Sequence, residues 1–143
     1  MKKTTCLVVG LIACFCLAGL CGCGGDDDND TATVSGTAYL STAPDGVKVY
    51  MKLVASGADS TATALYFTAS EPFSSGEATY TLTGVENGSY TGYAFIDMNE
   101  NAAGDDTSMP DDGDYVTDGG GDLVVNGDTV SDIPEVAWVA YSD

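Results

Sequence analysis

The chain has 143 residues, of which 22 are acidic, four are basic and none is histidine, so its formal net charge is −18. Such a charge repels nucleic acid and anionic lipid surfaces, which leaves cations and basic molecules as the favoured partners. The lack of histidine excludes Ser-His-Asp and Cys-His catalysis, and it excludes zinc sites that use imidazole.

Residues 1–22 have the pattern of a signal peptide. Lys2 and Lys3 precede an apolar run of fifteen residues, 6–20, which is too short to span a bilayer comfortably as a helix. The run ends in LCGC, residues 20–23, which resembles the bacterial lipobox: an aliphatic residue, then small residues, then the cysteine that is lipidated. Cys21 fits this pattern less well than Cys23, because a large leucine directly precedes it.

The lipobox resemblance implies that the mature protein begins at Cys23 and carries acyl chains on its sulfur and amino group. Two or more chains anchor a protein stably to a membrane, whereas a single chain binds only marginally. The alternative is a cleaved signal peptide whose cysteine stays unmodified. Gly24 stands where an aspartate would retain a lipoprotein in the inner membrane, so the resemblance implies the outer membrane or the cell surface.

Processing at Cys23 would leave a mature chain with no internal disulfide and a stronger negative charge. All five cysteines lie in the leader or at its end, so an exported domain must depend on its apolar core or on bound ions. Lys2 and Lys3 would leave with the leader, so two lysines would oppose 22 acidic residues and the net charge would be −20.

Residues 23–31 are predicted to form a flexible acidic tether, because GGDDDND combines glycines with a run of like charges. Residues 32–143 are then long enough for one domain with a single core. The expected domain organisation is therefore a signal peptide at 1–22, a tether at 23–31 and a folded domain at 32–143.

Alternation of apolar and polar residues predicts an all-β domain. In residues 47–54, VKVYMKLV, the alternation places Val49, Met51 and Leu53 on one face of a strand and both lysines on the other. Helix-like spacing is nearly absent, while Asn-Gly and Asp-Gly pairs mark tight turns. We expect a single Greek-key β-sandwich of about seven strands, near residues 33–40, 47–54, 63–69, 78–83, 89–96, 122–125 and 136–141.

Residues 80–97, YTLTGVENGSYTGYAFID, resemble the carboxypeptidase regulatory-like and prealbumin-like β-sandwich domains. The family pattern has an aromatic residue, an alternating strand, a glycine and a hydrophobe, then a short turn that ends in glycine and a tyrosine. The matching positions are Tyr80, Leu82, Gly84, Val85, Gly88 and Tyr90. Glu86 and Asn87 stand where the family's turn often has proline. The resemblance implies an accessory module with no active site of its own.

Residues 96–122 contain nine acidic side chains and no basic one. Asp97, Asn99 and Asn101 occupy the first three positions of a D-x-[DN]-x-[DN] calcium loop, and Asp105 falls at the ninth. Ala102 and Ser108 replace the glycine and the glutamate that an EF-hand requires, so a true EF-hand is not expected. Hard oxygen ligands favour calcium over zinc or copper. The predicted metal ligands are Asp97, Asn99, Asn101, Asp105 and Asp106, with the later cluster Asp111, Asp112 and Asp114 as alternatives to Asp106.

A solvated acidic loop remains the alternative to a calcium site. Two carboxylates held about 4 Å apart repel by roughly 4 kcal/mol at an effective dielectric constant of 20. A bound cation would offset this repulsion, but an open loop avoids it by spreading into water. The sequence leaves both interpretations open.

Aromatic residues leave a second choice open. Trp138 is flanked by small apolar residues and is predicted to lie in the core. Tyr39, Tyr50 and Tyr93 are expected on an outer sheet face, where they would contact a ligand or merely cover the strands. The leading hypothesis is a non-enzymatic, lipid-anchored envelope module, stabilised by calcium, in adhesion or envelope assembly, with an unidentified protein or glycan partner. The alternative hypothesis is a carbohydrate- or solute-binding lipoprotein.

Overall fold

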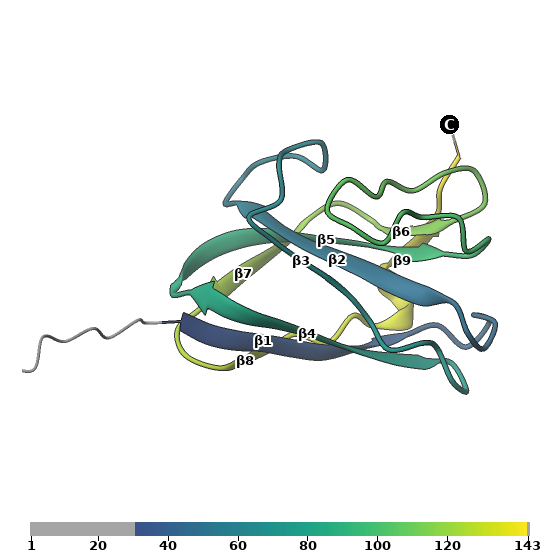
Figure 1. Ribbon diagram of the computed structural model, residues 1–143, viewed down its shortest axis with the longest axis horizontal. Coiled ribbons are helices and arrows are strands. Elements are labelled where there is room, and N and C mark those ends of the chain that lie inside the picture. The colour runs from purple at the N-terminus through teal and green to yellow at the C-terminus, as the bar shows by residue number, and fades with distance from the viewer. Residues whose placement is uncertain (1–30, 143) are drawn as a thin grey trace, which may run out of the picture.

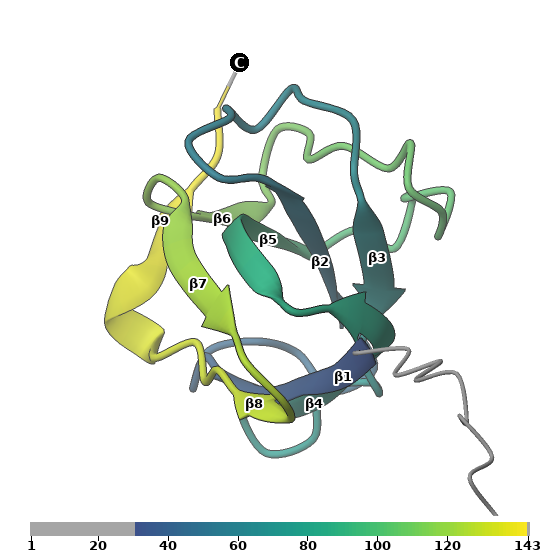
Figure 2. The ribbon, with the colours of Figure 1, turned by 90° about the vertical axis from the view of Figure 1, so that its left-hand side faces the viewer.

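The computed structural model describes residues 31–142, which form two β-sheets packed face to face (Figure 1). Seen along the strands, the two sheets enclose one core between them (Figure 2). The predicted all-β sandwich is therefore confirmed. The leader, Cys23 and nearly all of the tether lie outside the described residues. Within residues 31–142, no helix is long and apolar enough to cross a membrane.

The smaller sheet has three strands and the larger has six. In spatial order the smaller sheet contains β4 (Glu77–Glu86), β1 (Thr31–Tyr39) and β8 (Thr129–Val130). The path of the larger sheet is β3 (Tyr66–Ala69), β2 (Lys48–Ala55), β5 (Gly88–Asp97), β6 (Tyr115–Thr117) and β9 (Trp138–Ala140), with β7 (Gly121–Val125) also paired to β5. A 3-10 turn, η1 (Glu135–Ala137), precedes β9.

Each of the seven predicted strands overlaps an observed strand, and the described part of the chain contains two more. The two additional strands, β6 and β8, have three and two residues. Strands of this length are too short to show an alternating pattern, so their position is set by their neighbours. β8 pairs in parallel with β1, and β6 bridges β5 and β9.

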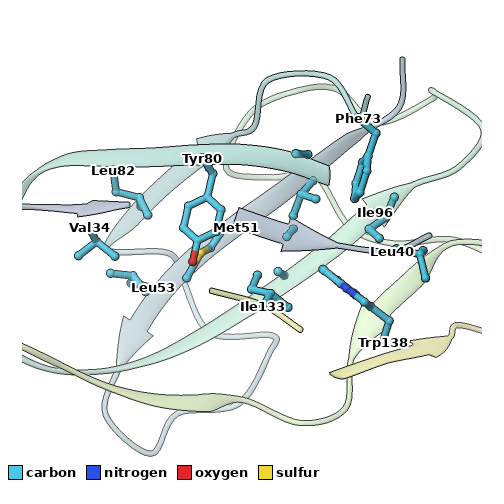
Figure 3. Packing of buried hydrophobic residues seen from close by; sticks show 14 of the residues in the cluster. Val34, Leu40, Met51, Leu53, Phe73, Tyr80, Leu82, Ile96, Ile133 and Trp138 are labelled. Carbon is cyan, nitrogen blue, oxygen red and sulfur yellow. The ribbon is translucent and has the colours of Figure 1, made fainter. Parts of the chain in front are cut away.

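The core lies between the sheets and is built from the predicted alternation. Met51 and Leu53 of β2 point towards Val34 of β1 and Leu82 of β4 (Figure 3). Trp138 is 8% exposed and belongs to this core, which confirms the prediction for that residue. Its Nε1 donates a hydrogen bond to the Tyr39 carbonyl across 3.0 Å, so the polar atom of the buried indole is satisfied.

A buried tyrosine connects β4 to the segment that follows β8. The hydroxyl of Tyr80 donates a hydrogen bond to the carbonyl of Ser131. Gly36 of β1 lies directly against this pair, and a Cβ at that position would collide with both the Ser131 carbonyl and the Tyr80 hydroxyl. Glycine is therefore required at position 36 because three segments of backbone and side chain meet there.

The two central strands of the larger sheet are buried on both faces. On β2, Leu53 faces the core, while Tyr50 and Val54 are buried although they lie outside the core cluster. On β5, Ile96 faces the core and Phe95 is buried on the opposite side. Long loops therefore cover the outer face of this sheet, which a simple sandwich would leave to solvent.

The strand directions place the two ends of the domain far apart. Thr31 begins β1, β4 runs antiparallel to β1, and β5 returns after the tight turn at Asn87. Asp97 at the end of β5 consequently lies at the end of the sandwich opposite Thr31 (Figure 1). The chain enters at one end, and the loop that follows Asp97 is displayed at the other.

Replacement of Tyr80 by phenylalanine should make the fold less stable at neutral pH but less sensitive to alkali. Burial raises the pKa of Tyr80 above its usual value of 10.0. The folded protein therefore holds this proton more tightly than the unfolded chain, so the contribution of Tyr80 is complete below pH 10 and is lost as pH rises further. Loss of the hydrogen bond should lower the free energy of unfolding by about 1 kcal/mol at neutral pH.

Urea unfolding at neutral pH and again above pH 10 measures both effects. Tyr80→Phe should lose less stability across this interval than the unaltered chain, while Tyr39→Phe, on an exposed side chain, should behave like the unaltered chain. Equal losses in all three proteins would contradict the assignment to Tyr80.

Candidate functional site

The predicted metal ligands lie in or beside one long loop, residues 98–114, which joins β5 to β6 and is called the acidic loop below. Hydrogen bonds from backbone amides to side-chain oxygens organise this loop. Two of its acceptors, Asp97 and Asp114, are buried carboxylates at 3% and 1% exposure. Buried carboxylates require compensating hydrogen bonds or cations, so their partners determine what the loop can do.

The carboxylate of Asp97 closes the first turn of the acidic loop. Its two oxygens accept hydrogen bonds from the backbone N–H groups of Asn101 at 3.1 Å and Ala102 at 2.9 Å. The Asn101 N–H also contacts the side-chain oxygen of Asn99 at 3.2 Å. The D-x-N-x-N spacing thus produces a turn in which side-chain oxygens converge on successive backbone amides.

The carboxylate of Asp114 joins the two ends of the acidic loop. It accepts hydrogen bonds from the backbone N–H groups of Met98 at 2.9 Å and Asp111 at 3.1 Å. The Asp114 carbonyl in turn accepts a hydrogen bond from the backbone N–H of Tyr141 at 2.8 Å. The sequence analysis placed Asp114 only among the alternative ligands, because a bond to an amide sixteen residues away leaves no local pattern.

Asp111 is the acidic residue that the structure brings to the two asparagines. Its oxygens accept hydrogen bonds from the amide nitrogens of Asn99 at 2.9 Å and Asn101 at 2.5 Å. Asp97, Asn99, Asn101 and Asp111 therefore form a connected group at the start of the acidic loop. Sequence spacing alone named the first three of these residues and assigned Asp111 a secondary place.

Asp105 and Asp106 do not join this group. Asp105 is fully exposed, and its oxygen accepts hydrogen bonds from the Thr107 hydroxyl at 2.6 Å and from the Thr107 backbone N–H at 3.0 Å. These bonds lower the pKa of Asp105, the hydroxyl contributing most. Asp106 is also exposed. Within residues 31–142, no three acidic, histidine or cysteine side chains are grouped in a way that could hold a metal ion.

A cation bound in the acidic loop would therefore take a mixed set of oxygens. Asp97 and Asp111 supply carboxylates, and Asn99 and Asn101 supply amide oxygens once their amides rotate away from Asp111. Each carboxylate has about four acceptor positions, so those of Asp97 are only partly occupied by its two backbone partners. Such a set suits a hard cation such as calcium, which accepts carboxylate, amide and backbone oxygens in flexible geometry.

A second candidate site is a pocket of about 250 Å³ on the outer face of the larger sheet. Tyr50 and Tyr93 line it, as their expected position on an outer face requires, whereas Tyr39 lies on the other sheet. Burial raises the pKa of Tyr50, and the negative charge of Asp97 adds to this shift. Trp138 lies in the core and does not line this pocket.

Comparisons of this chain with models of protein families, with curated proteins and with solved structures found no match.

Removal of the Asp114 carboxylate should destabilise the protein through the acidic loop. Asp114→Ala leaves the buried amides of Met98 and Asp111 without acceptors, which should cost about 3 kcal/mol. Asp112→Ala is the matched control, because Asp112 is exposed, and its effect should stay within about 0.5 kcal/mol. Denaturant unfolding measures both values.

Hydrogen exchange supplies the local test of the same prediction. In Asp114→Ala the amides of Met98 and Asp111 should lose protection, while those of β2 should change only as far as global stability falls. Unchanged protection at both amides would show that Asp114 does not hold the loop.

Proposed function

We propose that the protein is a non-enzymatic module anchored by lipid on the outer membrane or cell surface, acting in adhesion or envelope assembly. The observation that carries this proposal is the placement of the two ends of the domain. Thr31, where the chain leaves the lipidation motif, lies opposite the acidic loop (Figure 1). An anchor at Cys23 would thus present the acidic loop away from the membrane.

The use of the carboxylates supports a binding role over catalysis. Catalysis by a carboxylate pair requires two acids in a cleft whose environments separate their pKa values. The deeply buried acids Asp97 and Asp114 instead accept hydrogen bonds from backbone amides and organise the loop. A loop with a defined shape and a strongly negative surface suits contact with a cationic group on a partner.

We include calcium in this proposal as a stabilising ion of the acidic loop. Asp97, Asn99, Asn101 and Asp111 are connected by hydrogen bonds, so one cation could contact all four after small rotations of their side chains. The affinity expected of such an extracellular site is about 0.1 to 1 mM.

Lipidation is tested by Cys23→Ser in a bacterial host that processes lipoproteins. The unaltered chain should sediment with membranes, and mass spectrometry of its N-terminal peptide should show an acylated Cys23. Cys23→Ser should lose the acyl chains and the membrane association, whereas Cys21→Ser should retain both because the lipidated cysteine is intact. An unmodified first residue on freely released protein would refute the anchor.

Calcium binding is tested by thermal melting of the full chain. At about 10 mM calcium, a dissociation constant of about 0.1 to 1 mM corresponds to roughly 1 to 3 kcal/mol of stabilisation. Asp111→Asn should reduce this gain strongly. Asp106→Asn should retain it, because Asp106 lies outside the connected group. A midpoint that rises equally with magnesium or at matched ionic strength would show that no specific site exists.

A second candidate function is binding of a solute. The observation that favours it is the pocket on the outer face of the larger sheet, with Tyr50 and Tyr93 in its lining. This function is compatible with the lipid anchor, because the pocket lies on a side of the sandwich and the anchor joins one end. The two candidates use different surfaces and can be tested separately.

A further inference from the structure

The outer face of the larger sheet carries a row of stacked aromatic rings. Phe67 of β3, Tyr50 of β2 and Phe95 of β5 stand on three adjacent strands. The ring centroid of Tyr50 lies 6.0 Å from that of Phe67 and 5.0 Å from that of Phe95, with interplanar angles of 16° and 24°. These spacings are close to the separation of neighbouring strands, so the ring faces turn towards one another and their edges point away from the sheet.

Two loops stand over this row and hold a pocket open between them. The first, residues 56–65, joins β2 to β3 and is called the β2–β3 loop. Gly57 N–H donates to the Thr91 hydroxyl at 2.9 Å, the Tyr93 hydroxyl donates to the Ala58 carbonyl at 2.9 Å, and Lys52 Nζ donates to the Ser60 carbonyl at 2.5 Å. These bonds attach the loop to the sheet.

The acidic loop forms the opposite wall of the pocket. Met109 and Pro110 line it from that side, and the Ser108 hydroxyl accepts hydrogen bonds from the amides of Gly104 and Asp105 at 2.9 and 3.2 Å. Both walls are therefore held by specific hydrogen bonds to the loop backbone. A pocket whose walls are already ordered loses less entropy when a ligand enters.

The volume of the pocket limits the ligand to a single small ring system. About 250 Å³ is slightly below the roughly 300 to 1,000 Å³ of sites that take drug-sized molecules. Aromatic and aliphatic side chains dominate the lining, and a few hydroxyl groups stand at its rim, including those of Ser60 and Thr61. A compact, mostly apolar molecule with one polar substituent matches this composition.

The electrostatics of the lining select the type of ring. The edges of Tyr50, Phe67 and Phe95 carry the positive part of the ring quadrupole, so they attract the electron-rich face of another ring in an edge-to-face contact. Lys52, one of two lysines among the described residues, adds an ammonium group to the same lining. An ammonium group over a ring face is attracted in the same sense.

Two other ligand classes fit this lining less well. Anions are disfavoured because the chain carries a net charge of −18 and Asp97 lies close enough to act on Tyr50. Sugar rings stack on open aromatic faces, but the stacked faces of Tyr50 and its neighbours are occupied by one another. An uncharged aromatic ring satisfies the size, the edge geometry and the charge together.

We propose that this pocket binds a small, uncharged, electron-rich aromatic molecule of the phenol or indole class. The ring lies across the edges of Tyr50, Phe67 and Phe95, beside the ammonium group of Lys52. Its hydroxyl or N–H group reaches the hydroxyl groups at the rim. This inference rests on the second candidate function, solute binding, and names its ligand class.

Isothermal titration of the full chain with p-cresol and with indole tests the proposal, with protein-free buffer of the same detergent as the reference. Saturable binding with one site per chain is expected at ligand concentrations up to about 10 mM, which would reveal even a millimolar dissociation constant. Lys52→Met should weaken binding about fivefold, because it removes the ammonium group but retains most of the apolar stem.

Lys48→Met is the matched control for Lys52→Met. Lys48 lies on the same strand and points to the same side, but it is exposed and does not line the pocket, so its replacement should leave the affinity unchanged. Phe67→Leu supplies a second variant, because Phe67 lies half-buried on an edge strand outside the main core. It should also weaken binding, and melting curves will show whether each variant is folded.

Three outcomes would overturn the proposal. Equal affinities in Lys52→Met and Lys48→Met would show that the rings bind elsewhere on the protein. Saturable binding of methyl glucoside without binding of p-cresol or indole would retain solute binding but refute the ligand class. Silence towards all of these probes would refute the ligand class and count against solute binding itself, while leaving lipid anchoring and calcium binding unaffected.

Discussion

The hydrogen bonds from backbone amides to two buried carboxylates are the constraint on which both candidate sites depend. Asp97 and Asp114 together accept four such bonds, and these hold the start and the ends of the acidic loop. A long loop without helix or strand would otherwise be costly to order. Because these bonds order it, the acidic loop both gathers the candidate calcium ligands and forms one wall of the pocket.

The covering of the larger sheet explains why one domain offers two separate surfaces. A small sandwich normally buries one face of each sheet and leaves the other to water. Here Tyr50 and Phe95 are buried on the outer face of the larger sheet, although they lie outside the sandwich core. The β2–β3 loop and the acidic loop create this second apolar layer and leave a cavity within it. The end of the domain remains acidic and open to water.

The charge of the protein has different consequences at these two surfaces. At the end of the domain, Asp111 lies among the amides of Asn99 and Asn101, which reduces the repulsion that exposed acids would otherwise exert on one another. In the pocket, Lys52 supplies a cation close to the aromatic row, and its ammonium group is held by the Ser60 carbonyl. A lipid anchor at the opposite end would leave both surfaces accessible.

The sequence by itself determined the fold class, because the period-two alternation of apolar residues in stretches such as 47–54 has only one solution, a strand with one buried face. It also placed Trp138 in the core and Asp97, Asn99 and Asn101 in a calcium-like turn, since those patterns are local. Only the tertiary structure decided that Asp111, rather than Asp105 or Asp106, meets the asparagines, and that Asp114 closes the loop. These contacts join residues ten or more positions apart across an irregular loop, where no periodicity links sequence to position. The aromatic row likewise required the strand register, because Phe67, Tyr50 and Phe95 become neighbours only when three strands pair.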